Sequence, residues 1–360
     1  MKQEMLEKLN RYTVEIVKFH FSDNTGSKFW LSKLKELPFD PLKEINGFSD
    51  LKKFPDFSDE LRNIPIYDLV PKGLRQEQNM LPDVFESGGA TGKPKRIIEY
   101  NSRLRGIEWI NEVLNLHGFP SNEIRGEWLF VGPSGPHIVG RSMGRLAKLR
   151  GSMCFYIDFD PRWVRKCIKG GETSTANKYI DHIIQQVKDI LIEQNIKVIF
   201  ITPTILEKLI SDKELLKVAK EKIKGIIWSG TSFSSESIRL IKEDIFNGIV
   251  VIGLYGNTIM GIAGQRPASV DDKYPANFYP YFPNSIIEVV DFQDSTRLVD
   301  YYQTGQVKVT LLTKEMFLPN NLERDQAVRI PPSGELFAWD GVAEVKPIVT
   351  PDQKIIEGVY

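Results

Sequence analysis

The sequence predicts an α/β fold in which a parallel sheet is followed by a β-rich region. Between residues 177 and 253, short apolar runs alternate with stretches of helical periodicity, as βαβ units require. After about Gly264 the pattern changes, because Tyr, Phe and Pro cluster between Tyr274 and Pro283 and strand patterns follow. The 360 residues are enough for two or three domains or subdomains, at roughly 100–200 residues each.

The middle of the chain presents these units in order. Residues 177–194 place apolar side chains at helical spacing, and residues 198–201 form an apolar run typical of a buried parallel strand. Pro203 suits the first turn of a helix over residues 204–210. The pattern then predicts a strand at 226–228, a helix at 234–245 and a strand at 249–253. Parallel strands joined by helices imply right-handed crossovers.

The regions on either side differ from this pattern. Residues 1–75 combine Lys, Glu and Phe with prolines that break the stretch into short pieces, which predicts a helical segment wrapped around the remainder. Residues 285–291 and 306–313 read as strands, with a turn at Thr304 and Gly305. The predicted division is a wrapping segment at 1–75, α/β subdomains at 76–264, a β-rich, barrel-like subdomain at 265–345 and a short tail at 346–360.

Charge and rare residue types exclude several classes of function. The chain carries 47 Lys and Arg against 47 Asp and Glu, so it lacks the net field that holds nucleic acid or an anionic membrane. Two cysteines and four scattered histidines argue against a disulfide framework and a His/Cys metal site. Residues 1–20 lack the apolar core of a signal peptide, and no apolar run reaches the ~20 residues of a membrane span. We therefore expect a cytoplasmic protein with no nucleic-acid or membrane partner.

A Gly-rich loop at residues 86–96, ESGGATGKPKR, is the most informative segment. Small residues leave backbone N–H groups uncovered, and such groups can surround phosphate oxygens. The spacing fits neither a Walker A loop nor a dinucleotide-binding fingerprint, because a proline follows the lysine and the alternation at 96–100 predicts a β-hairpin. A surface hairpin without a ligand is the alternative. We favour a phosphate-binding loop that uses Ser87, Gly88, Gly89, Thr91, Gly92 and Lys93.

Residues 87–95 resemble the phosphate loop of the adenylate-forming superfamily, which includes acyl-CoA synthetases, peptide-synthetase adenylation domains and luciferases. The resemblance runs from about Phe85 to about Val349. It implies the large N-terminal domain of that fold, with two α/β subdomains and a distorted β-barrel, and it implies ATP and Mg²⁺ as cofactors. It also implies catalytic roles for Thr91, Lys93 and Thr258, with Lys93 at the β/γ-phosphate end.

A second motif of that superfamily is a Tyr-Gly-x-Thr-Glu stretch after a strand. Here residues 255–259 read YGNTI and follow the strand predicted at 249–253. The resemblance implies that Tyr255 lies against the adenine and that Thr258 contacts the α-phosphate. Ile259 departs from the pattern, because it replaces the glutamate that helps to hold Mg²⁺. An aliphatic side chain cannot bind a hard cation, so metal binding would be weaker, or supplied by another carboxylate or by the phosphates.

Two further segments match positions that surround the ligand in the superfamily. Residues 228–234, WSGTSFS, follow a strand and open a helix that Ser234 could cap. The equivalent loop lies along the adenine and the acyl pocket, which implies acid-pocket positions for Trp228 and Gly230. His137, in the stretch GPSGPH, resembles the aromatic or His position that lines the acyl pocket. A capping loop without a ligand, a core tryptophan and a structural histidine are the alternatives.

Residues 305–325 resemble one branch of the superfamily, the phenylacetate-CoA ligases. In that branch a Gly-Glu strand and a Leu-Thr-Lys-Glu turn lead to an Arg-Asp or Gly-Asp pair. Here Gln306 replaces the glutamate, and the pair is Arg324 and Asp325. Asp325 would accept hydrogen bonds from the ribose hydroxyls, and a solvated loop acid is the alternative. The branch also implies a homodimer.

The nucleotide contacts predicted on this resemblance are Ser87, Gly88, Gly89, Thr91, Gly92, Lys93, Ser229, Gly230, Thr231, Ser232, Tyr255, Gly256, Asn257, Thr258 and Asp325. The predicted acid pocket consists of His137, Trp228 and Gly230. Full-length members continue into a small C-terminal domain, whose lysine contacts the carboxylate and the α-phosphate. This sequence ends at Tyr360, near the family hinge, so we expect that domain to be missing or to be a separate polypeptide.

The predicted function is ATP-dependent activation of a carboxylic acid, preferentially an aryl acid, to an acyl-adenylate. The similarly short, stand-alone adenylating enzymes of phenazine pathways imply a role in secondary metabolism. The predicted partners are the acid and, for a later transfer, CoA or an acyl-acceptor protein. Two alternatives stay open: a non-catalytic protein that binds a nucleotide or acyl-adenylate, and an acid–CoA ligase that needs a separate C-terminal domain.

Overall fold

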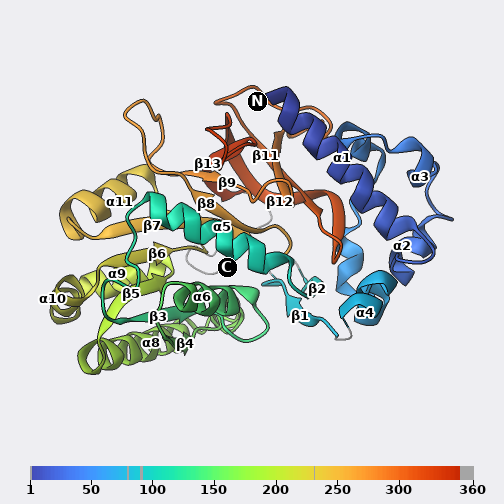
Figure 1. Cartoon of the computed structure of the whole chain (residues 1–360). Helices are drawn as coiled ribbons and strands as arrows, with labels where there is room; N and C mark the ends of the chain where they lie inside the picture. Colours follow the sequence, from blue (N-terminus) through green and yellow to red (C-terminus); the bar gives the residue numbers. More distant parts are fainter. Residues whose placement is uncertain (1, 79–80, 90–91, 231, 349–360) are drawn as a thin grey trace.

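The computed structural model describes residues 2–78, 81–89, 92–230 and 232–348, and it has a mixed α/β architecture built on one large sheet (Figure 1). The order of the described strands in this sheet is β10-β11-β12-β13-β9-β8-β7-β6-β5-β3-β4. Their bounds are β3 Glu127–Gly132, β4 Cys154–Asp158, β5 Ile196–Ile201, β6 Gly225–Trp228, β7 Val250–Asn257, β8 Gly261–Gln265, β9 Asn277–Tyr279, β10 Ser285–Val290, β11 Thr304–Leu312, β12 Phe317–Ile330 and β13 Gly341–Pro347. A separate hairpin consists of β1 Asp83–Glu86 and β2 Arg96–Glu99.

Helices cover both faces of the parallel half of the sheet, which consists of β4, β3, β5, β6 and the first half of β7. Successive side chains of a strand point to opposite faces, so Val198 and Phe200 pack toward one set of helices while Ile199 and Ile201 pack toward the other. The first face is covered by α5 Ser102–Leu116 and α6 Ile138–Leu149. The second is covered by α7 Pro161–Lys169, α8 Thr173–Glu193, α9 Pro203–Ser211, α10 Lys213–Lys222 and α11 Ser235–Leu240.

The remaining strands are antiparallel and extend the same sheet beyond β7. The N-terminal region packs against them, so that Phe21 and Trp30 lie against Phe317 of β12 with ring centroids 6.2 and 5.0 Å away. Figure 1 shows these N-terminal helices in blue beside the red and orange strands. They are α1 Lys2–Phe21, α2 Lys28–Lys33, α3 Pro41–Glu44 and α4 Lys72–Gln78, with 3₁₀ turns η1 Phe48–Lys53, η2 Ser58–Arg62 and η3 Ile66–Leu69.

The structure confirms the predicted α/β class and the predicted order of elements between residues 177 and 253. Ser234 accepts a hydrogen bond from the backbone N–H of Ser237 at 3.0 Å and caps α11, as expected. The helix predicted over 234–245 ends at Leu240 and continues as a π-helical turn, η4 Ile241–Ile245.

The turn predicted at Thr304 and Gly305 is wrong. Both residues begin β11, because they pair with Val328 and Ala327 of β12. The described strands pair in an open order from β10 to β4, so closure into a distorted barrel stays a prediction, as does the division into subdomains. Within the described residues, no helix is both long and apolar enough to cross a bilayer.

Candidate nucleotide and acid site

The Gly-rich loop joins the two strands of the β1–β2 hairpin, as the alternation after it predicted. Glu86 pairs with Arg96, and Ser87 then closes the base of the loop with two contacts to Lys95. The Ser87 N–H donates to the Lys95 carbonyl at 2.9 Å, and the Lys95 N–H donates to the Ser87 hydroxyl at 2.9 Å. Gly89 has a φ of 64°, which favours glycine. Thr91 lies outside the described residues.

Strand β7 changes partners along its length, and this change positions the second motif. Val250–Gly253 pairs parallel with β6, whereas residues 254–257 pair antiparallel with β8. Tyr255 and Asn257 are therefore part of a strand rather than a turn after one. The Thr258 hydroxyl donates to the Glu86 carbonyl at 3.2 Å, so the end of β7 is fixed against the base of the phosphate loop.

Tyr255 and Asp325 form a half-buried hydrogen-bonded pair between β7 and β12. The Tyr255 hydroxyl donates to Oδ2 of Asp325 at 3.0 Å, although the two residues are 70 positions apart. Burial raises the pKa of Tyr255 well above its usual value, and the negative charges of Asp325 and Glu323 act in the same direction. Tyr255 therefore stays a neutral donor. Burial also raises the pKa of Asp325, which the Tyr255 hydrogen bond and the Arg324 charge oppose.

These elements surround one cavity of about 230 Å³, which we call the main cavity. Its wall contains nine of the residues predicted from the sequence: Ser87, Gly88, Gly89, His137, Ser229, Tyr255, Gly256, Asn257 and Thr258. The phosphate loop, the end of β7 and the loop before α6 thus converge on a single space. Parallel strands place ligands at their carboxyl ends, and Ser229 and Thr258 follow two such ends.

Several predicted residues lie elsewhere. Gly92, Gly230, Ser232 and Asp325 do not line the main cavity, and Thr231 is outside the described residues. Lys93 is exposed, and its ammonium lies 3.4 Å from Oδ1 of Asn63 rather than in the cavity wall. Trp228 is only 5% exposed, packs edge-on against Phe233 and Phe278 and does not line the main cavity, so its acid-pocket role stays a prediction.

His137 lines the main cavity at the start of α6. Burial lowers the pKa of its imidazole, and the nearby Arg162 charge lowers it further, so the ring is neutral near pH 7. Its Nε2 atom is buried and has no hydrogen-bond partner among the described residues. An orphaned buried nitrogen costs about 1–3 kcal/mol, and a ligand in the cavity would remove that cost.

The sequence reasoning missed two groups of wall residues. One is apolar and comprises Ile138, Val139, Met143, Phe200, Leu254 and Ile262. The other is charged and comprises Arg62, Lys95, Arg103, Glu323 and Arg324. Arg324 and Asp325 were recognised as a pair, but only the aspartate received a role. Nothing in the local sequence identifies Arg62 or Arg103 as cavity residues, because they come from distant elements.

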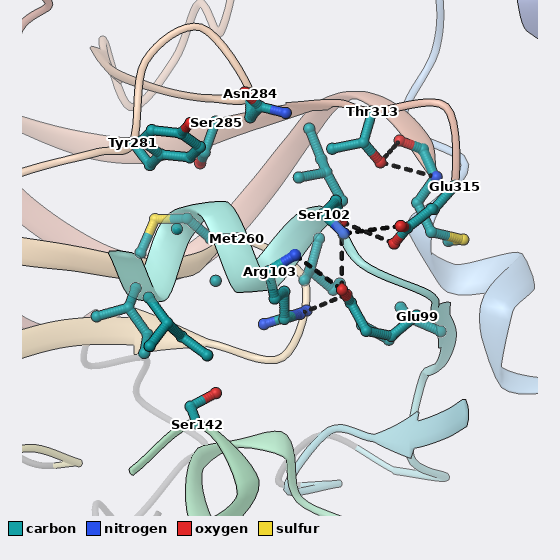
Figure 2. A pocket seen from close by; sticks show the side chains of 18 of the residues that line it. Glu99, Ser102, Arg103, Ser142, Met260, Tyr281, Asn284, Ser285, Thr313 and Glu315 are labelled. Carbon is teal, nitrogen blue, oxygen red and sulfur yellow. Dashed lines mark hydrogen bonds and ion pairs between the residues drawn. The ribbon is translucent and has the colours of Figure 1, made fainter. Parts of the chain in front are cut away.

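A smaller pocket of about 50 Å³ adjoins the main cavity, and we call it the side pocket (Figure 2). Its polar wall is dominated by Glu99 and Glu315 near the N-terminus of α5. Glu315 accepts hydrogen bonds from the backbone N–H groups of Asn101 and Ser102 at 2.6 and 2.7 Å, and from the Ser102 hydroxyl at 2.7 Å. The two cavities share five wall residues: Arg103, Ser142, Ile259, Gly261 and Ile262.

Arg103 connects the side pocket to the nucleotide motif. Its Nε lies 2.9 Å from Oε2 of Glu99, and its Nη2 donates to the carbonyl of Thr258. Burial raises the pKa of Glu99 to about 7, and the charge of Glu315 adds to this, while Arg103 opposes it. The Glu99–Arg103 ion pair therefore fixes the backbone of Thr258 through the hydrogen bond from Arg103 to the Thr258 carbonyl.

The described residues do not fit a protein-bound Mg²⁺ ion. They contain no group of three or more His, Cys, Asp or Glu side chains able to hold a metal. Ile259 is 4% exposed and packs in the apolar core. The one carboxylate in the main cavity wall, Glu323, accepts a hydrogen bond from Asn321 at 2.6 Å, and burial raises its pKa. Mg²⁺ prefers ionised oxygen ligands in octahedral geometry, which this arrangement does not offer.

Comparison with solved structures identifies the fold. No protein-family model and no curated protein sequence matches this chain. An open conformation of 2-hydroxyisobutyryl-CoA ligase, in complex with 2-HIB-AMP and CoA, superposes with a TM-score of 0.64 at 13% identity over 94% of this chain and 73% of that one. The same enzyme in its postadenylation state with 2-HIB-AMP gives a TM-score of 0.62 at 14% identity, over 94% and 66%.

The chain has the fold of the N-terminal domain of adenylate-forming enzymes. It spans about two thirds to three quarters of the matched ligase chains. At these identities the agreement concerns the fold, and the chemistry has to be argued from the residues of this chain.

Proposed function

We propose that this protein activates a carboxylic acid with ATP to form an acyl-adenylate and pyrophosphate. The observation that carries the proposal is the convergence of the phosphate loop, the Tyr255–Thr258 motif and His137 on the main cavity. Two solved structures with this fold are of a ligase described in complex with an acyl-AMP, and one of these complexes also contains CoA. We extend the proposal to CoA or an acyl-acceptor protein as the destination of the acyl group.

The reaction needs positioning more than covalent help from the protein. An oxygen of the acid attacks the α-phosphorus of ATP, the bond from that phosphorus to the bridging oxygen breaks, and pyrophosphate leaves. Holding the carboxylate beside the α-phosphate lowers the barrier because translational freedom is lost on binding rather than during the reaction. Fixed donors that face the developing charge lower it further.

The nucleotide is proposed to lie between the phosphate loop and strand β12. Tyr255 would lie against the adenine, and Asp325 would accept hydrogen bonds from the ribose with the oxygen that does not already accept from Tyr255. The backbone N–H groups at Gly88 and Gly89 would face the phosphates. Thr258 is proposed to contact the α-phosphate, and its present bond to the Glu86 carbonyl keeps it beside the loop.

The acid is proposed to occupy the apolar part of the main cavity. Apolar side chains from several elements line it, and Phe200 offers an aromatic ring, which supports an apolar or aryl acid. Neutral His137 would use its unpartnered Nε2 to hold a polar atom of the acid or of the acyl-adenylate. His137 would then fix the orientation of the acid without carrying a charge.

The direct test is carboxylate-dependent exchange between pyrophosphate and ATP, measured with a panel of aryl and aliphatic acids. We expect exchange with at least one apolar acid and none without acid. Calorimetry with AMP and ATP, done in parallel, separates the two remaining readings. AMP binding without exchange for any acid would favour a non-catalytic nucleotide-binding protein. Absence of AMP binding would exclude both the adenylating enzyme and the nucleotide-binding protein.

A further inference from the structure

The wall of the main cavity carries more positive than negative charge. Among its described residues, the cations are Arg62, Lys95, Arg103 and Arg324, and the carboxylate is Glu323. Two of the cations share one acidic partner, since Arg62 and Lys95 lie 3.0 and 3.7 Å from Oδ1 of Asp59. The cavity therefore offers an excess of donors to an anion.

Arg324 is the cation with the least compensation. It lines the main cavity, its residue is exposed, and it makes no ion pair within 4.0 Å in the part of the chain that the structure describes. It belongs to strand β12, and its carbonyl accepts a hydrogen bond from the Ile348 N–H at 2.7 Å, which holds its backbone in place. A rigid backbone and an uncommitted guanidinium are the features expected of a residue that meets a ligand.

Arg165 lies behind the Gly-rich loop, outside the main cavity wall, and is close enough to Arg324 for the two charges to influence each other. Its Nη2 donates to the Gly88 carbonyl at 2.5 Å, while its Nη1 is buried without a partner among the described residues. Burial lowers the pKa of Arg165, and the charges of Arg324 and Arg162 act the same way while Asp160 opposes them. Like charges held together around an unpartnered donor leave a deficit that an anion would remove.

A divalent cation would be a poor alternative for this position. It would have to enter a wall that already holds four cations, and Glu323 is the carboxylate of that wall. Guanidinium groups, in contrast, bind phosphate oxygens through planar, paired N–H donors and keep their charge at any physiological pH.

We propose that Arg324 and Arg165 form a binding site for the terminal phosphates of ATP next to Gly88, and that this site replaces a protein-bound divalent metal. The inference rests on the proposed function for the identity of the ligand as a nucleotide. It assigns the pyrophosphate end to residues outside the Gly-rich loop, and it makes ATP binding independent of Mg²⁺.

The test is calorimetric titration of AMP, ATP and pyrophosphate into the purified protein, in Mg²⁺ and in EDTA. The ATP affinities in the two buffers should differ by less than about threefold, and pyrophosphate should bind in EDTA. Arg324→Gln and Arg165→Gln should each weaken ATP and pyrophosphate by roughly tenfold or more while AMP affinity is kept, as expected for loss of one charge-assisted contact.

Arg297→Gln is the matched control, because Arg297 is exposed, pairs with Asp291 and lies outside the cavity wall. It should change none of the affinities. If Arg165→Gln disturbs the loop, Arg324→Gln still decides, since Arg324 is exposed and unpaired. ATP binding that requires Mg²⁺, or an unchanged ATP affinity in Arg324→Gln, would overturn this inference while AMP binding leaves the proposed function intact. If the wild-type protein does not bind AMP, the proposed function itself is overturned.

Discussion

The main cavity and the side pocket share wall residues but differ in whether their buried polar groups have hydrogen-bond partners. In the side pocket, both oxygens of Glu315 and both oxygens of Glu99 accept hydrogen bonds from the protein itself. In and behind the main cavity, Nε2 of His137 and Nη1 of Arg165 are buried without partners among the described residues. The sign of the charge differs as well, with carboxylates in one and mostly cations in the other.

On the proposed function, this difference separates a structural site from a ligand site. A buried polar group that the protein satisfies needs nothing further, whereas an orphaned one carries a cost that persists until a ligand arrives. In the side pocket Ser285 has an unpartnered buried hydroxyl, which a water molecule in a space of about 50 Å³ can satisfy. Damage to the side pocket should therefore reduce stability, and damage to the main cavity should reduce affinity.

The largest effect is expected from Glu315→Ala. This substitution removes the Glu315 acceptor from three donors at the start of α5, of which the Ser102 hydroxyl keeps Oε1 of Glu99 at 3.3 Å, and it should lower the free energy of unfolding by about 2–4 kcal/mol. Urea denaturation measures the change, and exposed Glu335→Ala serves as the control. The affinity for AMP should stay the same, and a parallel loss of affinity would mean that the side pocket is part of the ligand site.

The second effect is a pH dependence that comes from Glu99. Its pKa rises from 4.5 to about 7 on folding, so between these values the folded state binds more protons than the unfolded state. The contribution of Glu99 is therefore present at acidic pH and is lost as the pH rises through about 7, with a maximal size of about 3 kcal/mol.

The measurement for Glu99 is the unfolding free energy of wild type minus that of Glu99→Gln, from pH 4.5 to 8. The difference should fall with rising pH, since the glutamine does not titrate. A difference that rises with pH would show that the Arg103 ion pair outweighs burial, and the side pocket would then gain stability from the ionised acid.

A moderate effect is expected from Asp325→Asn, next to the main cavity, where Asp325 accepts from the cavity residue Tyr255. The amide can still accept from Tyr255, but it replaces one acceptor oxygen with an N–H donor, so AMP should bind roughly tenfold to hundredfold more weakly. Calorimetry gives the affinity, and Asp271→Asn at an exposed position is the control. An unchanged AMP affinity would contradict the proposed contact between the ribose and Asp325 of β12.

The smallest effect is expected from His137→Phe. The ring size is kept while the nitrogen atoms are lost, so the KM for the acid should rise by roughly fivefold to tenfold, with little change in AMP affinity. Exposed His182→Phe on α8 is the control. A fall in stability without a change in KM would assign His137 to the same structural class as Glu315.

The sequence predicts the parallel half well because its strands are buried on both faces. Val198 and Ile226 lie in continuous apolar runs, and that pattern is specific for a strand between helices. The end of β7 was harder to read, because glycine and asparagine at 256 and 257 are typical of turns. Pairing with β8 keeps them in a strand, and such pairing cannot be seen in local composition.

The residues of the candidate site also divide into those that the sequence predicts and those that it does not. Motif residues that are close in sequence, such as Ser87 and Gly88, could be found from their order along the chain. Glu315 could not, because it reaches Ser102 from 213 positions away. Trp228 shows the reverse case: its position beside a motif residue indicated a pocket, and local sequence could not show that its side chain packs against Phe233 and Phe278.

The change of partners within β7 has a consequence for biosynthesis. The strands that flank its first half, β5 and β6, leave the ribosome before it, so this part of the sheet can assemble early in translation. Its second half faces Asp325, which is made 70 residues after Tyr255. On the proposed function, a nascent chain gains no stability from nucleotide until β12 has emerged, so the nucleotide would assist folding steps that follow the assembly of the parallel strands.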